Sequence, residues 1–373
     1  MRVSKFRVRQ FRNLQNVEVS PSRILNILVG DNGQGKTSFI EALYYLSTLQ
    51  SFRTNKTSDL IQKNQGGFLL EAEVSGKSNL NTDLSLRIES KTRKAFINHK
   101  PVTGAKFTAQ LRAVVFSPES LSSIKAGPES RRALIDQATY QLSERSSYAQ
   151  RAYTKALRQR NACLRQVKSA ELTPAIGEDI LSSLEGAFLE TGAEVTEERL
   201  CFLDQIFPKI DHILEKITGV GDRLKFTYRS GQEPWIEREK HQILYRLRSE
   251  LNSSDRRKAE RTAGITLTGP HRHDISFLFN ENDSRIFCSQ GQQRAVILAF
   301  KIAEIVYHSE VFGSFPLLLL DDVLSEFDEH KRRYLLEFLK NNEAQTFLTT
   351  TDQTHLLEES RVFQVEAGRV NLK

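Results

Sequence analysis

Hydrophobic and polar positions follow three different patterns along the chain. In the first third the pattern has the two-residue period of β-strands. Residues 3–10 show it most clearly, with Phe6 and Val8 on one face and basic residues on the other. Further short, β-rich runs are separated by Gly, Asn and Ser and are also predicted as strands. These runs cover residues 24–29, 69–75, 84–89, 95–98 and 113–117.

The middle of the chain, from about residue 131 to residue 219, has the period of α-helices. An apolar stripe there combines spacings of three and four residues. It consists of Leu181, Leu184, Phe188, Thr191 and Val195. A second helix is predicted over residues 243–251.

The last third returns to alternating strands and helices. Strands are predicted near residues 264–267, 317–320 and 346–348. We therefore predict an α/β fold in which both chain ends build one sheet domain and a mainly helical lobe is inserted between them.

Residues 30–37 fit the phosphate-binding pattern G-x-x-x-x-G-K-[ST] at every position, between an apolar strand and a helical stretch over residues 38–49. Glycines let backbone N–H groups converge on phosphates, and a helix N-terminus adds a positive partial charge. We predict that Lys36 reaches the β- and γ-phosphates of ATP and that Thr37 ligates Mg²⁺. The predicted nucleotide-binding residues of this phosphate loop are Gly30, Asp31, Asn32, Gly33, Gln34, Gly35, Lys36, Thr37 and Ser38.

Two acidic residues lie far from this loop in the sequence. The apolar strand over residues 317–320 ends in Asp321 and Asp322. A strand buried on both faces has no reason to end in two acids unless they meet a cation or water. Asp321 would hold Mg²⁺, and Asp322 would orient the attacking water as a general base. The alternative is helix capping, in which Asp322 favours the start of the next helix.

A polar segment at residues 288–294 precedes an apolar helix predicted over residues 295–306. Alone it is also a generic polar helix start, in which Ser289 suits the N-cap. Phosphate loop, polar helix start and acidic strand occur here in the order that resembles the ABC-type ATPases. The resemblance implies that this signature segment contacts nucleotide bound on a second subunit, through Ser289, Gly291 and Gln292. It also implies that residues 325–328 form the loop that crosses the dimer interface.

Further segments narrow the resemblance to the RecF family of bacterial DNA repair proteins. These segments are residues 11–13, 115–119, 127–132 and 268–272. The resemblance spans nearly the whole chain and implies an ABC-ATPase head with mixed sheets and a phosphate-loop core formed by both chain ends. No heptads are sustained over enough length for a long coiled coil. The implied lobes are residues 1–120 with 262–373 for the ATPase and residues 121–261 for the inserted helical lobe.

The same resemblance implies a function. A RecF-like protein is a weak, DNA-stimulated ATPase that uses ATP and Mg²⁺. It forms an ATP-dependent homodimer on double-stranded DNA and at single-strand/double-strand junctions. There it assists RecO and RecR in loading RecA at gaps. By this resemblance Arg12 and Asn13 are expected at the nucleotide.

The sequence departs from the family pattern at Ser120 and His273, where RecF-like sequences commonly carry Asp. His271 and His273 would share one face of a strand, as a metal pair would, but we expect surface histidines because the cysteines offer no further ligand. The strand after the acids ends in three threonines, where transporter ATPases carry a histidine. Because threonine cannot act as a charged base, slow turnover is expected.

The net charge of +7 permits nucleic acid but also an acidic partner. Lys5, Arg7 and Arg9, on one face of the first strand, make the better case for DNA, whereas two basic clusters are expected to be solvated helix faces. The clusters are Lys155, Arg158, Arg160, Arg165 and Lys168, and Arg256, Arg257, Lys258 and Arg261.

Composition and the cysteine count exclude several other classes of protein. The longest apolar run, residues 315–320, is too short to span a membrane, and the N-terminus lacks a secretory signal, so a cytosolic protein is expected. Three distant cysteines exclude a disulfide framework and a zinc site. The alternatives to a RecF-like ATPase are an SMC-like clamp that only binds ATP, the nucleotide-binding subunit of a transporter, and a small-molecule kinase.

Overall fold

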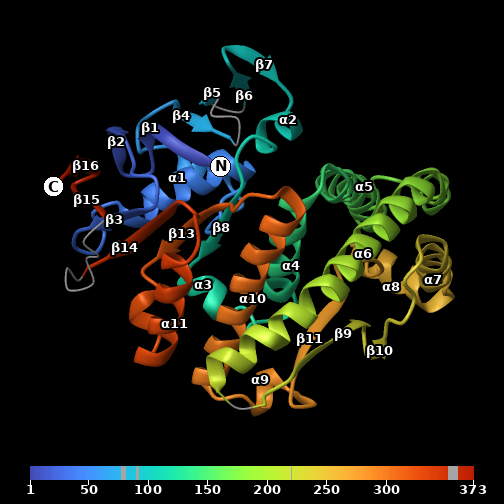
Figure 1. The fold of residues 1–373 in the computed structure, drawn as a ribbon. Helices are drawn as coiled ribbons and strands as arrows, with labels where there is room; N and C mark the ends of the chain where they lie inside the picture. The colour runs from blue at the N-terminus through green and yellow to red at the C-terminus, as the bar shows by residue number, and fades with distance from the viewer. Residues whose placement is uncertain (77–80, 90–91, 220, 352–359) are drawn as a thin grey trace. The chain divides into compact units, whose positions relative to one another are not determined.

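The computed structural model describes residues 1–76, 81–89, 92–219, 221–351 and 360–373. The chain divides into two compact units. The terminal unit consists of Met1–Leu121 and Ile297–Lys373, and the inserted unit is Ser122–Val296. Figure 1 shows that the first and last segments of the chain, blue and red, build the same unit. The predicted α/β class, with a core formed by both chain ends, is confirmed.

The terminal unit contains a six-stranded, mainly parallel sheet. Its order is β16-β15-β3-β14-β13-β8, and only the β15–β16 pair is antiparallel. Every residue of β3, β8, β13 and β14 is buried, as expected for parallel strands covered on both faces. The strands are β3 (Leu25–Val29), β8 (Ala113–Phe116), β13 (Leu317–Asp321), β14 (Thr346–Thr350), β15 (Arg361–Glu366) and β16 (Arg369–Leu372).

A second, antiparallel sheet of the terminal unit has the order β2-β1-β4-β5-β6-β7. Its strands alternate buried and exposed positions, so that one face is apolar. They are β1 (Arg2–Phe11), β2 (Leu14–Val19), β4 (Gly67–Ser75), β5 (Asn81–Glu89), β6 (Thr92–Ile97) and β7 (Lys100–Val102).

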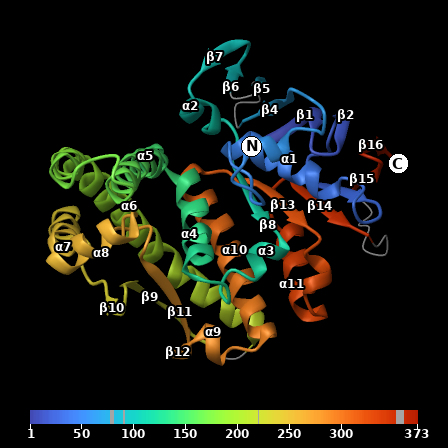
Figure 2. The same ribbon diagram turned by 180° about the vertical axis from the view of Figure 1, so that it is seen from behind.

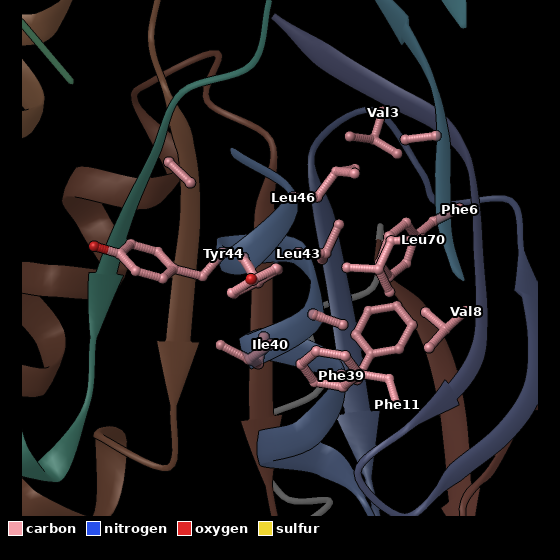
Figure 3. Close-up of a cluster of buried hydrophobic side chains, with 14 of the residues drawn as sticks. Val3, Phe6, Val8, Phe11, Phe39, Ile40, Leu43, Tyr44, Leu46 and Leu70 are labelled. Atoms are coloured by element: carbon pink, nitrogen blue, oxygen red, sulfur yellow. The ribbon is translucent and has the colours of Figure 1, made fainter. Parts of the chain in front are cut away.

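Helix α1 (Lys36–Thr48) lies between these two sheets in the buried core of the terminal unit (Figure 3). Phe39 of α1 meets Phe6 of β1 edge to face, with ring centroids 5.3 Å apart. Leu43 and Leu46 follow on the same side of the helix toward Leu70 of β4. The core therefore fixes the helix that directly follows the phosphate loop.

Among the described residues, the terminal unit has four further short helices and one longer helix, α11, in its C-terminal segment. They are η1 (Thr57–Leu60), α2 (Gly104–Thr108), α3 (Pro118–Leu121), η2 (Leu324–Glu326) and α11 (Glu329–Lys340). Helix α10 (Gln290–Phe312) begins in the inserted unit and continues in the terminal unit. No described helix is long and apolar enough to cross a membrane.

The inserted unit is mainly helical, and its long helices α5 and α6 pack along each other (Figures 1 and 2). The predicted helical stretch forms three helices, α4 (Pro128–Leu142), α5 (Glu144–Lys168) and α6 (Pro174–Thr218). The other helices are α7 (Lys240–Asn252), α8 (Ser254–Ala263) and α9 (Ser284–Phe287). A small sheet, β10-β9-β11-β12, consists of β9 (Leu224–Ser230), β10 (Glu233–Pro234), β11 (Asp274–Phe279) and β12 (Asn282–Asp283).

Pairing within this small sheet explains where the inserted unit ends. The sequence ends the inserted lobe at residue 261, whereas the compact unit continues to Val296. Strand β11 pairs with β9 over six residue pairs and thereby holds the later segment in this unit. The strand predicted at residues 264–267 is wrong: this segment is a loop that follows the left-handed Gly264 at the end of α8.

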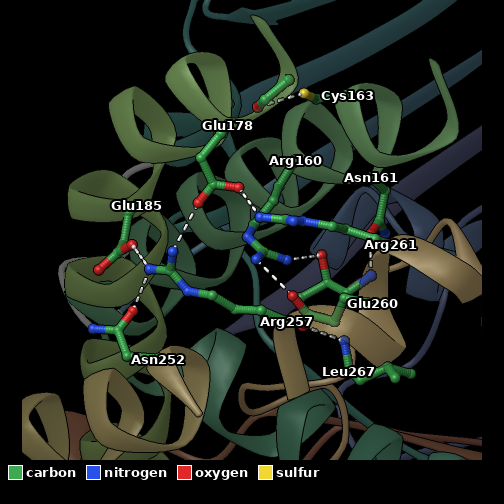
Figure 4. Close-up of polar contacts among 12 residues, drawn as sticks. Arg160, Asn161, Cys163, Glu178, Glu185, Asn252, Arg257, Glu260, Arg261 and Leu267 are labelled. Carbon is green, nitrogen blue, oxygen red and sulfur yellow. Dashed lines mark hydrogen bonds and ion pairs between the residues drawn. The ribbon is translucent and has the colours of Figure 1, made fainter. Parts of the chain in front are cut away.

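Three arginines of the two basic clusters, Arg160, Arg257 and Arg261, are held by acidic partners (Figure 4). Arg160 of α5 donates to Glu260 of α8 at 2.6 Å, and both side chains are buried. Arg257 of α8 donates to Glu178 of α6 at 2.7 Å, and Arg261 donates to the same carboxylate. These arginines fasten α8 to α5 and α6 and do not form a free basic surface.

His273 is fully buried, so the expectation of a surface histidine is wrong at this position. Its ring lies 4.6 Å from that of Trp235, and its Nδ1 is 3.1 Å from the Tyr228 hydroxyl. Burial lowers the pKa of His273 well below its usual value. His271 and His273 precede β11 instead of lying on it, and no group of three or more potential metal ligands occurs among the described residues. Trp235 and Phe188 are core residues.

Candidate nucleotide-binding site

The phosphate loop connects the end of β3 to the start of α1. Gly33 and Gly35 have φ angles of 81° and 122°, which favour glycine. A Cβ on Gly30 would lie 2.2 Å from the backbone oxygen of Val365 in β15. The loop therefore requires glycine for two reasons, backbone conformation and close approach to a neighbouring strand.

We predict that Gly30→Ala destabilises the terminal unit by about 1–3 kcal/mol, the usual cost of overpacking a tight interior. The added methyl group must displace the backbone of β15, because the atom it meets is a carbonyl oxygen. Chemical denaturation of both proteins measures the difference. Gly66→Ala is the matched control, since a Cβ at Gly66 meets no atom within 4 Å. Equal stability of the Gly30 variant and the control would contradict the prediction.

Lys36 lies within the curve of the phosphate loop and is almost completely buried. Its Nζ donates to the backbone oxygens of Gly30 at 2.5 Å and of Asp31 at 3.0 Å. Burial lowers the pKa of Lys36, and the nearby carboxylates of Asp322 and Asp321 oppose that shift. The ammonium group is thus held at the loop by neutral carbonyl oxygens, and an incoming phosphate oxygen would be a stronger, charged acceptor.

Thr37 and Asp321 meet although they are 284 residues apart. The Thr37 Oγ1 donates to Asp321 Oδ1 at 2.9 Å, and Thr349 Oγ1 donates to the same oxygen at 2.9 Å. Parallel pairing of β13 with β14 places Asp321 opposite Thr349 and so creates the second contact. Burial raises the pKa of Asp321, while both hydroxyl groups oppose that shift. A hydroxyl and a carboxylate are oxygen ligands of the kind that Mg²⁺ prefers, so this pair fits the predicted metal.

Asp322 follows in a left-handed conformation, with φ of 51°. Its backbone N–H donates to Thr349 Oγ1 at 2.8 Å, which fixes the turn at the end of β13. Burial raises the pKa of the Asp322 carboxyl, and Lys36 lowers it in part. The turn thereby separates the two acids: Asp321 bonds Thr37, and Asp322 lines the cavity beside Lys36.

These groups surround a cavity of about 510 Å³. The lining includes most of the predicted residues and three that sequence analysis missed, Arg53, Asp59 and Ile61. No motif marks these three; they come from the segment between α1 and β4, which only the fold brings to the loop. The predicted residues that line the cavity are Arg12, Asn13, Asn32, Gly33, Gly35, Lys36, Thr37, Ser38 and Asp322.

Asn13 and Gln34 hold the phosphate loop in place through their side chains. Asn13 accepts from Ser38 Oγ at 2.7 Å and donates to the Gly33 oxygen at 3.1 Å. Gln34 accepts from the backbone N–H of Ala367 at 2.7 Å, in the turn between β15 and β16. The side chain of Gln34, predicted to bind nucleotide, thus contacts the C-terminal hairpin.

The signature segment lies in the inserted unit and forms its own hydrogen-bonded cap. The Ser289 N–H donates to Gln292 Oε1 at 2.8 Å, and the Gln292 N–H donates to Ser289 Oγ at 3.2 Å. This reciprocal pair starts α10, in agreement with the simple alternative of a polar helix start. Ser289 and Gly291 are nevertheless exposed, so the segment remains accessible.

The buried parallel sheet, its phosphate loop and the acids at the end of β13 define the ATPase head of the ABC class. The family model "RecF/RecN/SMC N terminal domain" matches residues 2–371. The chain belongs to the RecF family.

Similarity to individual relatives extends over the full length. The chain is 36% identical to the "DNA replication and repair protein RecF" of Limosilactobacillus reuteri, covering 100% of this chain and 99% of the relative. It is 33% identical to the protein of that name from Citrifermentans bemidjiense, covering 99% and 100%.

Solved structures show the same fold. A structure of "the recombination mediator protein RecF-ATP in RecFOR pathway" superposes with a TM-score of 0.88 at 28% identity, covering 100% of this chain and 97% of the other. An Smc head domain from Pyrococcus furiosus superposes with a TM-score of 0.55 at 15% identity, which concerns the fold alone.

Proposed function

We propose that this protein binds Mg²⁺ and ATP at the phosphate loop and hydrolyses ATP slowly in the service of DNA repair. The observation that carries the proposal is that Lys36, Thr37 and Asp322 line one cavity and that Thr37 donates to Asp321 behind it. The relatives' names, which refer to DNA replication and repair and to an ATP complex, support it. Titration with ATP, with Mg²⁺ and then with a chelator, tests it, and absence of binding would overturn it.

The residues divide the chemistry among them. Lys36 exchanges its backbone acceptors for phosphate oxygens, and the N–H groups of the loop bind the rest of the triphosphate. Thr37 and Asp321 would hold Mg²⁺, which supplies Lewis-acid stabilisation of the phosphates. Asp322 orients a water molecule and accepts its proton. Thr349 bonds Asp321 and has no charge to offer, which supports slow turnover.

ATP-dependent dimerisation follows from the accessible signature segment. Ser289, Gly291 and Gln292 would contact the γ-phosphate on a second copy, so that the bound triphosphate becomes part of the interface. One subunit alone would then hydrolyse little, since its site lacks these groups.

Ser289→Arg is expected to leave ATP binding by the monomer unchanged and to prevent dimerisation. The exposed position tolerates the larger side chain, but the added bulk occupies the space in which a second copy must approach. Nucleotide titration combined with light scattering measures both properties. Thr262→Arg, which adds the same charge at another exposed position of the inserted unit, is the control and should dimerise normally. A dimeric Ser289 variant would contradict this role of the signature segment.

DNA binding is supported by a basic row on the outer face of the antiparallel sheet. Arg9, Leu69, Arg87 and Lys94 stand opposite one another on β1, β4, β5 and β6. Arg9 and Arg87 line a groove of about 730 Å³ together with amide side chains, and the three cations are exposed. Only Arg87 has an acidic partner among the described residues, Glu89 at 3.9 Å. Backbone phosphates of DNA suit such a row.

Lys5 and Arg7, the other basic residues of the face that the sequence predicts for DNA, share one acidic partner. Glu18 of β2 lies 2.8 Å from both Lys5 Nζ and Arg7 Nε, and their hydrogen bonds lower the Glu18 pKa to about 2. Arg9 therefore supports the sequence-based case for DNA better than Lys5 and Arg7.

Replacing Arg9, Arg87 and Lys94 together by alanine should weaken DNA binding and reduce the slope of log K against log salt by about 2–3, since each phosphate contact on a duplex contributes about 0.9. Fluorescence anisotropy with duplex, gapped and single-stranded DNA at several salt concentrations measures this slope. The matched control replaces Lys5 and Arg7, which are both paired with Glu18, and should change the slope less. Equal slopes in both variants would argue against the basic row.

From the family we also propose that the protein prefers single-strand/double-strand junctions and that DNA stimulates its hydrolysis of ATP. We further propose that it cooperates with RecO and RecR in loading RecA. A cytosolic location belongs to the proposal as well. An SMC-like clamp that binds ATP without hydrolysis is the alternative. Asp322 beside Lys36 favours the ATPase, and a turnover assay with and without gapped DNA distinguishes the two.

A further inference from the structure

Glu41 is a carboxylate with no place in the nucleotide chemistry described above. It lies on α1 one helical turn beyond Thr37 and is completely buried. A buried carboxylate is retained only where cations or hydrogen bonds compensate its charge. Its partners therefore indicate what it does.

Two arginines of the cavity lining meet at Glu41. Arg12, from the turn between β1 and β2, donates from Nε at 2.9 Å and from Nη2 at 2.7 Å to the two carboxylate oxygens. Arg53, from the loop after α1, places Nη1 3.7 Å from Oε2, which is an ion pair without a hydrogen bond. One carboxylate thus holds a fixed cation and a looser one at the same cavity.

The same carboxylate also orders the loop that carries Arg53. Ser51 Oγ donates to Glu41 Oε1 at 2.5 Å and accepts from the backbone N–H groups of Arg53 and Thr54. The turn at residues 51–54 is therefore tied to α1 through a single side chain. Glu41 connects three chain segments, of which two contribute an arginine to the cavity wall.

Both arginines keep N–H groups that can bind an anion. Nε and Nη2 of Arg12 are engaged by Glu41, and Nη1 has no partner among the described residues. Arg53 is the more exposed of the two, with 39% of its side chain accessible, against 21% for Arg12. A bidentate contact fixes the plane of a guanidinium group and so aims its remaining N–H groups.

We propose that Glu41 is a positioning residue that aims Arg12 and Arg53 at the nucleotide in the cavity. This inference rests on the proposed ATP site and assigns Glu41 no contact with nucleotide. Because Glu41 orders the two arginine side chains in advance, they lose less conformational entropy when an anionic ligand binds.

ATP binding by Glu41→Gln, alone and in combination with Arg12→Ala, tests this role. The amide keeps the shape of the side chain but cannot accept both hydrogen bonds of the Arg12 fork. Binding should weaken about tenfold, the loss expected when a long side chain must be ordered on binding instead of in advance. In the Arg12→Ala background the same substitution should cost much less, since its main route to the nucleotide is already absent. Equal losses in both backgrounds, or binding equal to wild type, would overturn the inference.

If Glu41→Gln disturbs folding, its midpoint of thermal unfolding without nucleotide will be lower than that of the wild type. A second variant then tests the same role. Arg12→Lys keeps the positive charge at a partly exposed position but loses the fork, so weakened binding again supports positioning and unchanged binding opposes it. Glu337→Gln, the same substitution at an exposed position of α11 that does not line the cavity, is the control. If the wild-type protein bound no ATP, the proposed function itself would fall, and this inference with it.

Discussion

Lys36→Met should weaken ATP binding by about a hundredfold or more, because a charge-assisted contact in a partly buried site contributes roughly 2–3 kcal/mol. Methionine fills the same space at this buried position, so the loop keeps its packing while the ammonium group is lost. In the free protein the carbonyl oxygens of Gly30 and Asp31 lose the Lys36 ammonium as a donor. In the complex the triphosphate loses the same ammonium as its most buried cation. Calorimetric titration with ATP and Mg²⁺ measures the loss.

The same variant tests whether nucleotide holds two copies together. If the triphosphate forms part of the dimer interface, Lys36→Met should sediment as a monomer at ATP concentrations that make the wild type a dimer. Lys340→Met, at the exposed end of α11, is the control and should behave as wild type. An unchanged dimer fraction in the Lys36 variant would refute the dependence of the dimer on nucleotide.

How far the sequence predicts this site depends on how local each part is. The phosphate loop is a contiguous pattern whose glycines, Lys36 and strand-to-helix context determine the backbone directly, and it could be recognised from eight residues. Asp321 and Asp322 could be recognised because a completely apolar strand precedes them. The pairing of Asp321 with Thr37 needed only the general rule that parallel strands end at one edge of a sheet.

Other parts could not be predicted because they depend on contacts between distant segments. Gln34 fits the phosphate-loop pattern, yet its side chain bonds a turn more than 300 residues away. Glu41 looks like an ordinary helical glutamate until folding brings Arg12 and Arg53 to it. His273 is buried because Tyr228 and Trp235 cover it, which no alternation near residue 273 reveals.

Asp322→Asn should leave ATP binding nearly unchanged and lower turnover by about a hundredfold or more, the usual contribution of a general base. Asparagine tolerates the left-handed conformation of this turn, so the backbone N–H bond to Thr349 is expected to persist. The amide occupies the same place in the cavity but cannot accept a proton from water. Single-turnover hydrolysis separates this chemical step from binding, and the ATP-bound dimer should accumulate.

The control distinguishes a base from a general effect of charge in the cavity. Asp59→Asn also removes a negative charge from the lining, but its carboxylate bonds Thr54 at the rim. If Asp322 acts on water, the Asp59 variant should turn over at nearly the wild-type rate. If both variants slow equally, the charge of the cavity matters more than a particular proton acceptor. Wild-type turnover by Asp322→Asn would refute its role as general base, and the hydrolytic base would have to lie elsewhere.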